Sequence, residues 1–141
     1  MNREDAKDAK IFLGDGDRAL DELAYLVFGA ALEVHRTLGP GYTELVYEEA
    51  LTIELTARSV PFQRQVPIFI DYKGHRVGGT RLDVLVDRKV VVELKAVDAL
   101  AKVHTAQVLS YLKATRCRLG LLINFNVPIL RSGMKRVVLT R

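Results

Sequence analysis

The hydrophobic pattern of the chain changes its period once, at Val60-Pro61, and this change constrains the fold more than any other feature. Before it, apolar residues recur at helical spacing over residues 19–38 and 43–58. Gly39-Pro40-Gly41 separates these segments, because proline cannot continue a helix and glycine accommodates the turn. We therefore expect two helices before the sheet. The second is expected to pack through Leu45, Val46, Ala50, Leu51 and Leu55.

The residues after Pro61 predict strands and one further helix. Residues 62–72 are rich in β-branched and aromatic side chains, and Lys73-Gly74 predicts a hairpin turn after them. The order of two helices, three strands, one helix and two strands (ααβββαββ) predicts an α/β fold with helices flanking a central mixed sheet. The remaining strands are expected at 82–86, 90–95, 119–125 and 137–139, and the helix at 100–116, with Val103, Ala106, Leu109 and Leu112 among its buried side chains.

The length of 141 residues suits one domain, and 49% hydrophobic with 27% charged residues is an ordinary globular balance. We expect a flexible lead-in over residues 1–18 and a single domain over residues 19–141. No apolar run approaches the roughly 20 residues that cross a bilayer, and the mixed-charge start has no apolar signal-peptide core. A cytoplasmic protein without membrane contact is therefore expected. Cys117, the one cysteine, is expected to pack near a helix end.

Two carboxylates and a lysine lie close together in the strand pair. A three-residue loop at 87–89 would bring Asp83 directly opposite Glu93, with Cβ atoms about 4.5–5.5 Å apart. Their repulsion and desolvation in an apolar setting are relieved by a hard divalent cation such as Mg²⁺. Lys95 lies two residues after Glu93 and therefore on the same face of the strand. This trio suits phosphodiester hydrolysis, and it also fits a surface strand pair with solvated or ion-paired side chains.

Two further groups of polar residues lie on predicted helices. Gln107 and Tyr111 are four residues apart and His104 precedes them by three, which gives a polar stripe on an otherwise apolar helix. Such a stripe is usually a solvent face, and here we favour a pocket wall. Glu44 lies in the first turn of the second helix, where a carboxylate interacts favourably with the helix N-terminus. Glu48, one turn later, would repel it slightly.

Several ordered motifs give the chain a family resemblance that a short acidic pattern alone would not. It closely resembles the GxxExxY proteins of the PD-(D/E)XK nuclease superfamily, from about residue 19 to the C-terminus. The motifs that carry the resemblance are Val34-His35-Arg36-Thr37-Leu38-Gly39-Pro40, Gly41-Tyr42-Thr43-Glu44-Leu45-Val46-Tyr47, Arg81-Leu82-Asp83-Val84-Leu85-Val86, Val92-Glu93-Leu94-Lys95-Ala96-Val97, Gln107-Val108-Leu109-Ser110-Tyr111-Leu112 and Leu122-Ile123-Asn124-Phe125.

The resemblance implies a restriction-endonuclease-like core and a role for each matching residue. Asp83 and Glu93 correspond to the metal-binding carboxylates and Lys95 to the catalytic lysine. Glu44 corresponds to the acidic residue that the first core helix adds to the metal site. The helix after the catalytic strand contributes Gln107 and Tyr111, which orient the site or contact substrate. His35 and Tyr47 also match, and we expect both to pack. No proline precedes Asp83, as the superfamily's name would suggest.

The resemblance implies a nuclease that hydrolyses phosphodiester bonds of nucleic acid with Mg²⁺ or Mn²⁺. We favour DNA over RNA as its substrate, a choice that the sequence leaves open. The net charge of +4 is compatible with polyanion binding without establishing it. Two alternatives stay open: a non-catalytic nucleic-acid-binding or regulatory module, and a subunit that needs a protein partner for targeting. A homodimer is a reasonable expectation, because cutting two strands with one small domain favours two-fold symmetry.

Overall fold

The computed structural model describes residues 17–140. Most of the lead-in expected over residues 1–18 therefore lies outside the described residues, and Arg18 already begins the first helix, whose N-cap is Asp17. The elements in chain order are α2 (Arg18–Leu38), α3 (Glu44–Ala57), β1 (Phe62–Tyr72), β2 (His75–Val86), β3 (Val90–Lys95), α4 (Lys102–Thr115), β4 (Leu119–Asn124), the 3-10 helix η1 (Leu130–Gly133) and β5 (Met134–Val138). This order confirms the predicted ααβββαββ succession.

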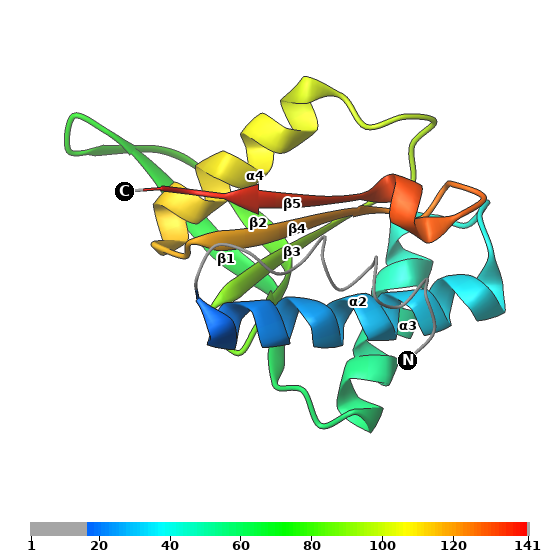
Figure 1. Cartoon of the computed structure of the whole chain (residues 1–141). Helices are drawn as coiled ribbons and strands as arrows, with labels where there is room; N and C mark the ends of the chain where they lie inside the picture. The colour runs from blue at the N-terminus through cyan, green and yellow to red at the C-terminus, as the bar shows by residue number, and fades with distance from the viewer. Residues whose placement is uncertain (1–16, 141) are drawn as a thin grey trace.

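The five strands form one mixed sheet in the order β1-β2-β3-β4-β5. Strands β3 and β4 are parallel, and every other neighbouring pair is antiparallel. Helices α2 and α3 pack on one face of the sheet and α4 on the other (Figure 1). The expectation of a restriction-endonuclease-like α/β fold is confirmed. No helix within residues 17–140 is long and apolar enough to span a membrane.

Each face of the sheet has its own hydrophobic core. Between the sheet and α2 and α3, the buried side chains include Val27, Leu51 and Val92. Between the sheet and α4, Leu112 and Leu122 pack in a smaller cluster. Strand β4 is buried along its whole length, which confirms the prediction from its continuous apolar run.

Three expectations about the helices and strands were wrong in detail. Strand β2 begins at His75 rather than Leu82, because its pairing with β1 continues through Gly78-Gly79 despite the weak strand propensity of glycine. In α4 the buried residues are Val108, Tyr111 and Leu112, whereas Val103 and Ala106 are exposed. Helix α3 buries Leu51 and Leu55 as expected and also Tyr47, Glu48 and Thr52, whereas Leu45 and Val46 are exposed. A helix of mixed polarity can turn either face inward, and the neighbouring elements decide which.

In β1 and β2, the alternation of side chains between the two faces of the sheet reverses at one row. In β2, Val84 and Val86 pack with α2 and α3, whereas Leu82 packs on the α4 side, although Leu82 and Val84 are two residues apart. The reversal coincides with a positive φ of 50° at Gln65 in β1, between the pairs Arg64↔Val84 and Val66↔Leu82. A regular strand keeps residues i and i+2 on one face. The reversal therefore falls at Asp83, the residue opposite Gln65.

Candidate active site

Asp83 lies where β2 and β3 separate. The loop at 87–89 pairs Val86 with Val90, as expected, but the ladder ends at Val84↔Val92, one pair before the predicted Asp83–Glu93 pair. The expectation that these residues form a directly opposed pair was therefore wrong. Instead, Asp83 Oδ2 accepts a hydrogen bond of 2.8 Å from the backbone N–H of Leu94. Because β2 and β3 no longer pair at this point, the buried Leu94 N–H has no partner on β2, and the Asp83 carboxylate takes that place.

Glu93 is only 4% exposed and shares its surroundings with Asp83. Burial, a hydrogen bond with Asp83 and repulsion by the Asp83 carboxylate raise the pKa of Glu93 to about 9. At neutral pH a carboxyl in this setting keeps its proton unless a cation compensates the charge. The pair of carboxyl groups is therefore costly to ionise and supplies the oxygen donors that Mg²⁺ and Mn²⁺ prefer.

Lys95 and Glu44 act on Glu93 through their charges. Lys95 lowers the pKa of Glu93 and Glu44 raises it, both less than burial and Asp83 do. Lys95 ends β3, is partly exposed, and forms no ion pair with any residue between 17 and 140. Its ammonium group is therefore not tied to a carboxylate. Glu44 begins α3 and is exposed to solvent.

The described residues contain no group of three or more Asp, Glu, His or Cys side chains arranged to hold a metal ion. Asp83 and Glu93 are brought together, whereas Glu44 reaches them only electrostatically. The two carboxylates fit a Mg²⁺ or Mn²⁺ ion that takes one or two protein ligands and fills its other positions with water and substrate oxygens. A ligand role for Glu44 stays a prediction.

Tyr111 and Gln107 lie on the side of α4 that faces the carboxylates. Tyr111 is buried, hydrogen-bonds with Thr80 of β2 and with Gln107, and its pKa is raised by burial and by the charges of Glu93 and Asp83. The prediction that this polar stripe forms a pocket wall stays a prediction. His104 does not share that position, because its Nδ1 accepts a hydrogen bond of 2.9 Å from the N–H of Ala101 and caps the helix.

The amino-acid sequence matches a known protein family. A family model described as PD-(D/E)XK nuclease superfamily matches residues 21–137. The chain belongs to the PD-(D/E)XK nuclease superfamily. No curated protein and no solved structure gives a significant match. Members of this superfamily are usually nucleases that use divalent metal ions, and the match covers all of the residues predicted for the site.

Tyr47 holds the loop that precedes Glu44 in this PD-(D/E)XK chain. Its hydroxyl group donates a 2.6 Å hydrogen bond to the carbonyl oxygen of Gly39 and accepts one of 3.2 Å from the N–H of Tyr42. Its ring stacks on Phe125, with centroids 4.5 Å apart. His35 Nε2 donates a 2.7 Å hydrogen bond to the carbonyl oxygen of Val127. The expectation that Tyr47 and His35 pack is confirmed.

Sequence reasoning missed a polar cluster that joins α3 to β1 beside Asp83. Glu48 is buried, and its Oε2 accepts hydrogen bonds of 3.1 and 2.7 Å from Arg64 while its Oε1 accepts one of 2.7 Å from Gln65. Arg64 also bonds Glu49 at 2.7 Å. These bonds compensate the buried charge of Glu48 and hold Gln65 at the row where the strands reverse. The sequence signal was Glu48, one turn after Glu44, whose repulsion a purely structural role for both carboxylates did not explain.

Asn124 is a second supporting residue without an assigned role in the sequence analysis. It pairs with Lys95 in the parallel ladder and is almost completely buried. Its Oδ1 accepts hydrogen bonds from the N–H groups of Val97 (3.1 Å) and Asn126 (3.2 Å), and its Nδ2 donates one of 2.9 Å to the carbonyl oxygen of Val97. These bonds fix the chain as it leaves β3, directly after Lys95.

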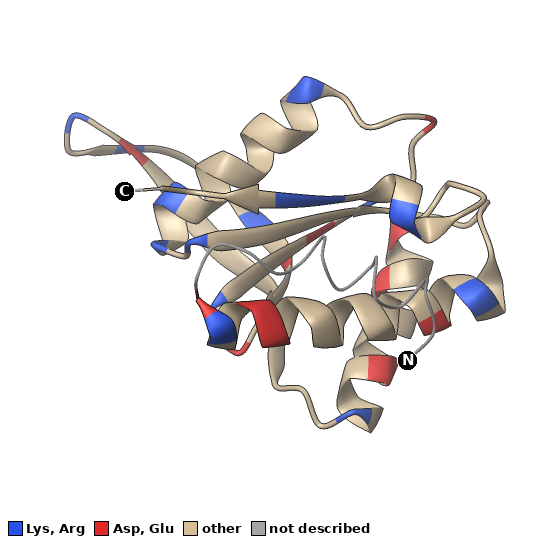
Figure 2. Cartoon of the chain, in the orientation of Figure 1, with Lys and Arg blue, Asp and Glu red and all other residues tan. Residues whose placement is uncertain are grey.

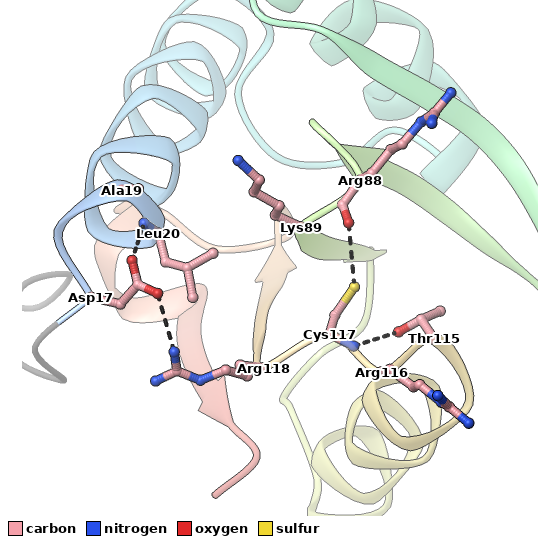
Figure 3. A pocket seen from close by; sticks show the side chains of 9 residues that line it. All are labelled: Asp17, Ala19, Leu20, Arg88, Lys89, Thr115, Arg116, Cys117 and Arg118. Atoms are coloured by element: carbon pink, nitrogen blue, oxygen red, sulfur yellow. Dashed lines mark hydrogen bonds and ion pairs between the residues drawn. The ribbon is translucent and has the colours of Figure 1, made fainter. Parts of the chain in front are cut away.

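A cavity of about 310 Å³ lies where the parallel strands β3 and β4 begin, at the end of the strands away from Lys95 (Figure 3). Its lining includes Cys117 but none of the residues predicted for catalysis. The Cys117 thiol is buried and donates a weak 3.8 Å hydrogen bond to the carbonyl oxygen of Arg88. The expectation that Cys117 packs just after a helix is confirmed. Two of the cations around the cavity, Arg88 and Arg116, extend away from it (Figure 3).

Proposed function

We propose that this chain is a metal-dependent nuclease that hydrolyses phosphodiester bonds of nucleic acid, with DNA as the expected substrate and Mg²⁺ or Mn²⁺ as its cofactor. The observation that carries the proposal is the buried Glu93 carboxyl group in contact with the partly buried Asp83 carboxyl group, in a chain of the PD-(D/E)XK superfamily. The nearby Lys95 ammonium group forms no ion pair with any residue from 17 to 140. A purely structural strand pair has no need for a buried carboxyl group in contact with a second one. The narrower assignment to the GxxExxY proteins rests on the motif at residues 41–47.

The proposed roles follow from the position of each side chain. Asp83 and Glu93 would hold the metal ion, with Glu44 as the expected third acidic residue. When bound, the divalent cation supplies a Lewis acid and a bound water of lowered pKa. Lys95 lies next to Glu93 and orients the attacking water or stabilises the charge that develops on a phosphoryl oxygen.

Tyr111 and Gln107 complete the proposed site from the α4 side. Tyr111 interacts with Thr80 and Gln107 and is close enough to Glu93 and Asp83 for their charges to raise its pKa, so its hydroxyl group would contact the substrate beside the carboxylates. Both residues are assigned to orienting substrate rather than to transferring protons. The support for this assignment is their shared hydrogen bond and the effect of the Asp83 and Glu93 charges on the pKa of Tyr111.

The test is a cleavage assay with labelled single-stranded, duplex and branched DNA and with RNA. Each substrate is incubated with Mg²⁺, Mn²⁺ or EDTA and with wild type, Glu93→Ala, Lys95→Ala or the matched control Glu22→Ala, whose side chain is exposed on α2. We expect metal-dependent cleavage by wild type and the control and a loss of at least about 100-fold in both site variants, as expected for a group that acts in the transition state.

The other results lead to different functions. Metal-dependent thermal stabilisation that Glu93→Ala abolishes, without cleavage of any substrate, would indicate a nuclease that requires a protein partner. Salt-dependent nucleic-acid binding with neither cleavage nor metal stabilisation would contradict the proposal and indicate a binding module. Light scattering on the same samples measures whether the protein is the expected homodimer.

A further inference from the structure

The outer half of the β1–β2 hairpin extends away from the sheet that holds the candidate site (Figure 1). Every residue from 69 to 81 is exposed to solvent, and none of them belongs to either hydrophobic core. We call residues 69–81 the hairpin arm. A two-stranded ribbon that buries none of its own side chains adds little to the stability of the domain, so its length and composition need another explanation.

The backbone of the hairpin arm has a defined shape. At its tip, Lys73 and Gly74 have φ values of 49° and 81°, which suit a two-residue turn with both central residues at positive φ. The pairing shifts by one residue between Ile70 and Asp71, and such a bulge increases the twist of a ribbon. The side chains of the hairpin arm are therefore presented on a twisted, hydrogen-bonded ribbon rather than on a loop.

Two of the three cations of the hairpin arm, Lys73 and Arg76, lie over aromatic rings. The Arg76 guanidinium carbon is 3.9 Å from the ring centroid of Phe69, and Lys73 Nζ is 5.4 Å from that of Tyr72. Within residues 17–140, neither cation forms an ion pair, and Asp71 is the arm's only carboxylate. The positively charged tip is visible in Figure 2. A guanidinium held over an aromatic ring keeps its N–H donors available, and such donors bind phosphates.

We propose that the hairpin arm binds a nucleic-acid strand with unpaired bases, its cations contacting phosphates and Tyr72 stacking on a base. Tyr72 is 61% exposed, and an exposed aromatic ring beside cations is typical of surfaces that bind single strands. The arm carries Lys73, Arg76 and Arg81 against the single carboxylate Asp71, so its charge is complementary to a polyanion and would repel the same arm of a second copy. This inference rests on the proposed nuclease function.

The base of the hairpin arm is joined to the candidate site. Strand β2 contains both the second half of the arm and Asp83, which lies two residues after the arm ends. Thr80, near the end of the arm, hydrogen-bonds with Tyr111 beside the carboxylates. Arg81 bonds the carbonyl oxygen of Gln65 at 3.4 Å. A strand held by the arm would therefore lead toward Asp83 and Glu93.

The test uses the full chain with Glu93→Gln as a non-cleaving background, in EDTA. Binding of a fluorescent single-stranded DNA 20-mer is measured by anisotropy at several salt concentrations. The variants are Lys73→Gln/Arg76→Gln and Tyr72→Ala. The matched control, Arg36→Gln/Arg88→Gln, removes the same charge from the end of α2 and from the turn at the other end of β2. Thermal unfolding of each variant checks that the domain is intact.

We expect Lys73→Gln/Arg76→Gln to weaken binding by at least about 10-fold and to reduce the slope of log K against log salt by about 1.4, because two phosphate contacts are lost. Tyr72→Ala should weaken binding by about 5-fold or more, and Tyr72→Phe should restore it. The control should keep the slope within experimental error. The same loss in the arm and control variants would overturn the inference, because it would reflect net charge alone.

Two results separate this inference from the proposed function. The same arm and control substitutions are also made in the wild-type chain and assayed for cleavage with Mg²⁺. If wild type cleaves nucleic acid, and the arm variants bind like the control in the Glu93→Gln background and cleave like the control in the wild-type background, the arm inference fails and the nuclease proposal stands. If no protein binds or cleaves any substrate, both fail. A change from dimer to monomer in the arm variants, without a change in DNA affinity, would assign the arm to a second copy of the chain and also overturn the inference.

Discussion

Replacing Glu93 with glutamine should stabilise the metal-free protein at neutral and alkaline pH. Burial and Asp83 raise the pKa of Glu93 to about 9, whereas a carboxyl group in the unfolded chain has the ordinary value of 4.5. Between these pH values the folded chain binds more protons than the unfolded chain, so the free energy of unfolding falls as the pH rises. The contribution of one group is about 1.4 kcal/mol per pH unit. From pH 4.5 to pH 7.5 this gives an upper limit of about 4 kcal/mol.

Glutamine has nearly the shape of a protonated glutamate and does not ionise, so Glu93→Gln should not lose stability over this range. The measurement is urea unfolding in EDTA at pH 5 to pH 9 for wild type, Glu93→Gln and the exposed control Glu22→Gln. The stability gain of Glu93→Gln should be small at pH 5 and grow steadily toward pH 9, and the control should follow wild type. A gain that does not change with pH, or a variant less stable than wild type at pH 8, would refute the argument that burial and Asp83 set this pKa. Added Mg²⁺ should stabilise wild type and not Glu93→Gln.

Three further substitutions test the contacts that support the site, each by urea unfolding. Arg64→Ala leaves the buried Glu48 without its cation and should lower the free energy of unfolding by about 3 kcal/mol; no loss would mean that Gln65 alone compensates the charge. Tyr47→Phe removes two hydrogen bonds to the loop before α3 and should cost about 1–3 kcal/mol, and an unchanged stability would show that the loop is held by stacking alone. Gly120→Ala places a Cβ atom 2.5 Å from Val108 Cγ1 and should cost about 1–3 kcal/mol, whereas a neutral result would mean that α4 moves freely away from β4.

Much of the fold followed from local patterns. The helices α2 and α3, the strand β1 and the turn at Lys73-Gly74 lie close to their predicted positions, because periodicity, proline and glycine act on neighbouring residues. The continuation of β2 back to His75 did not follow, since its glycines and exposed polar residues pair only because β1 lies beside them. The buried face of α4 also escaped prediction, because Val103 is as apolar as Val108 and only the sheet distinguishes them.

For the candidate site, too, the sequence predicted the residues but not their arrangement. Asp83, Glu93 and Lys95 were chosen from residue type and spacing, and Tyr111 from its helical neighbour Gln107. The spacing predicted a regular ladder pair, and the structure instead separates the strands at Asp83 and hydrogen-bonds its carboxylate to the N–H of Leu94. That separation coincides with the positive φ of Gln65 in another strand, which no pattern within residues 82–95 encodes.

The sequence by itself determined the order of the elements, the superfamily and the residue types available for chemistry, because these depend on neighbours along the chain. Only the tertiary structure decided which polar groups meet. It compensates Glu48 with Arg64, leaves Lys95 without an ion pair to any residue from 17 to 140, and buries Glu93 against Asp83. The physical reason is that burial and the distances between charges set the cost of ionising a carboxyl group, and both arise from contacts between residues far apart in the sequence.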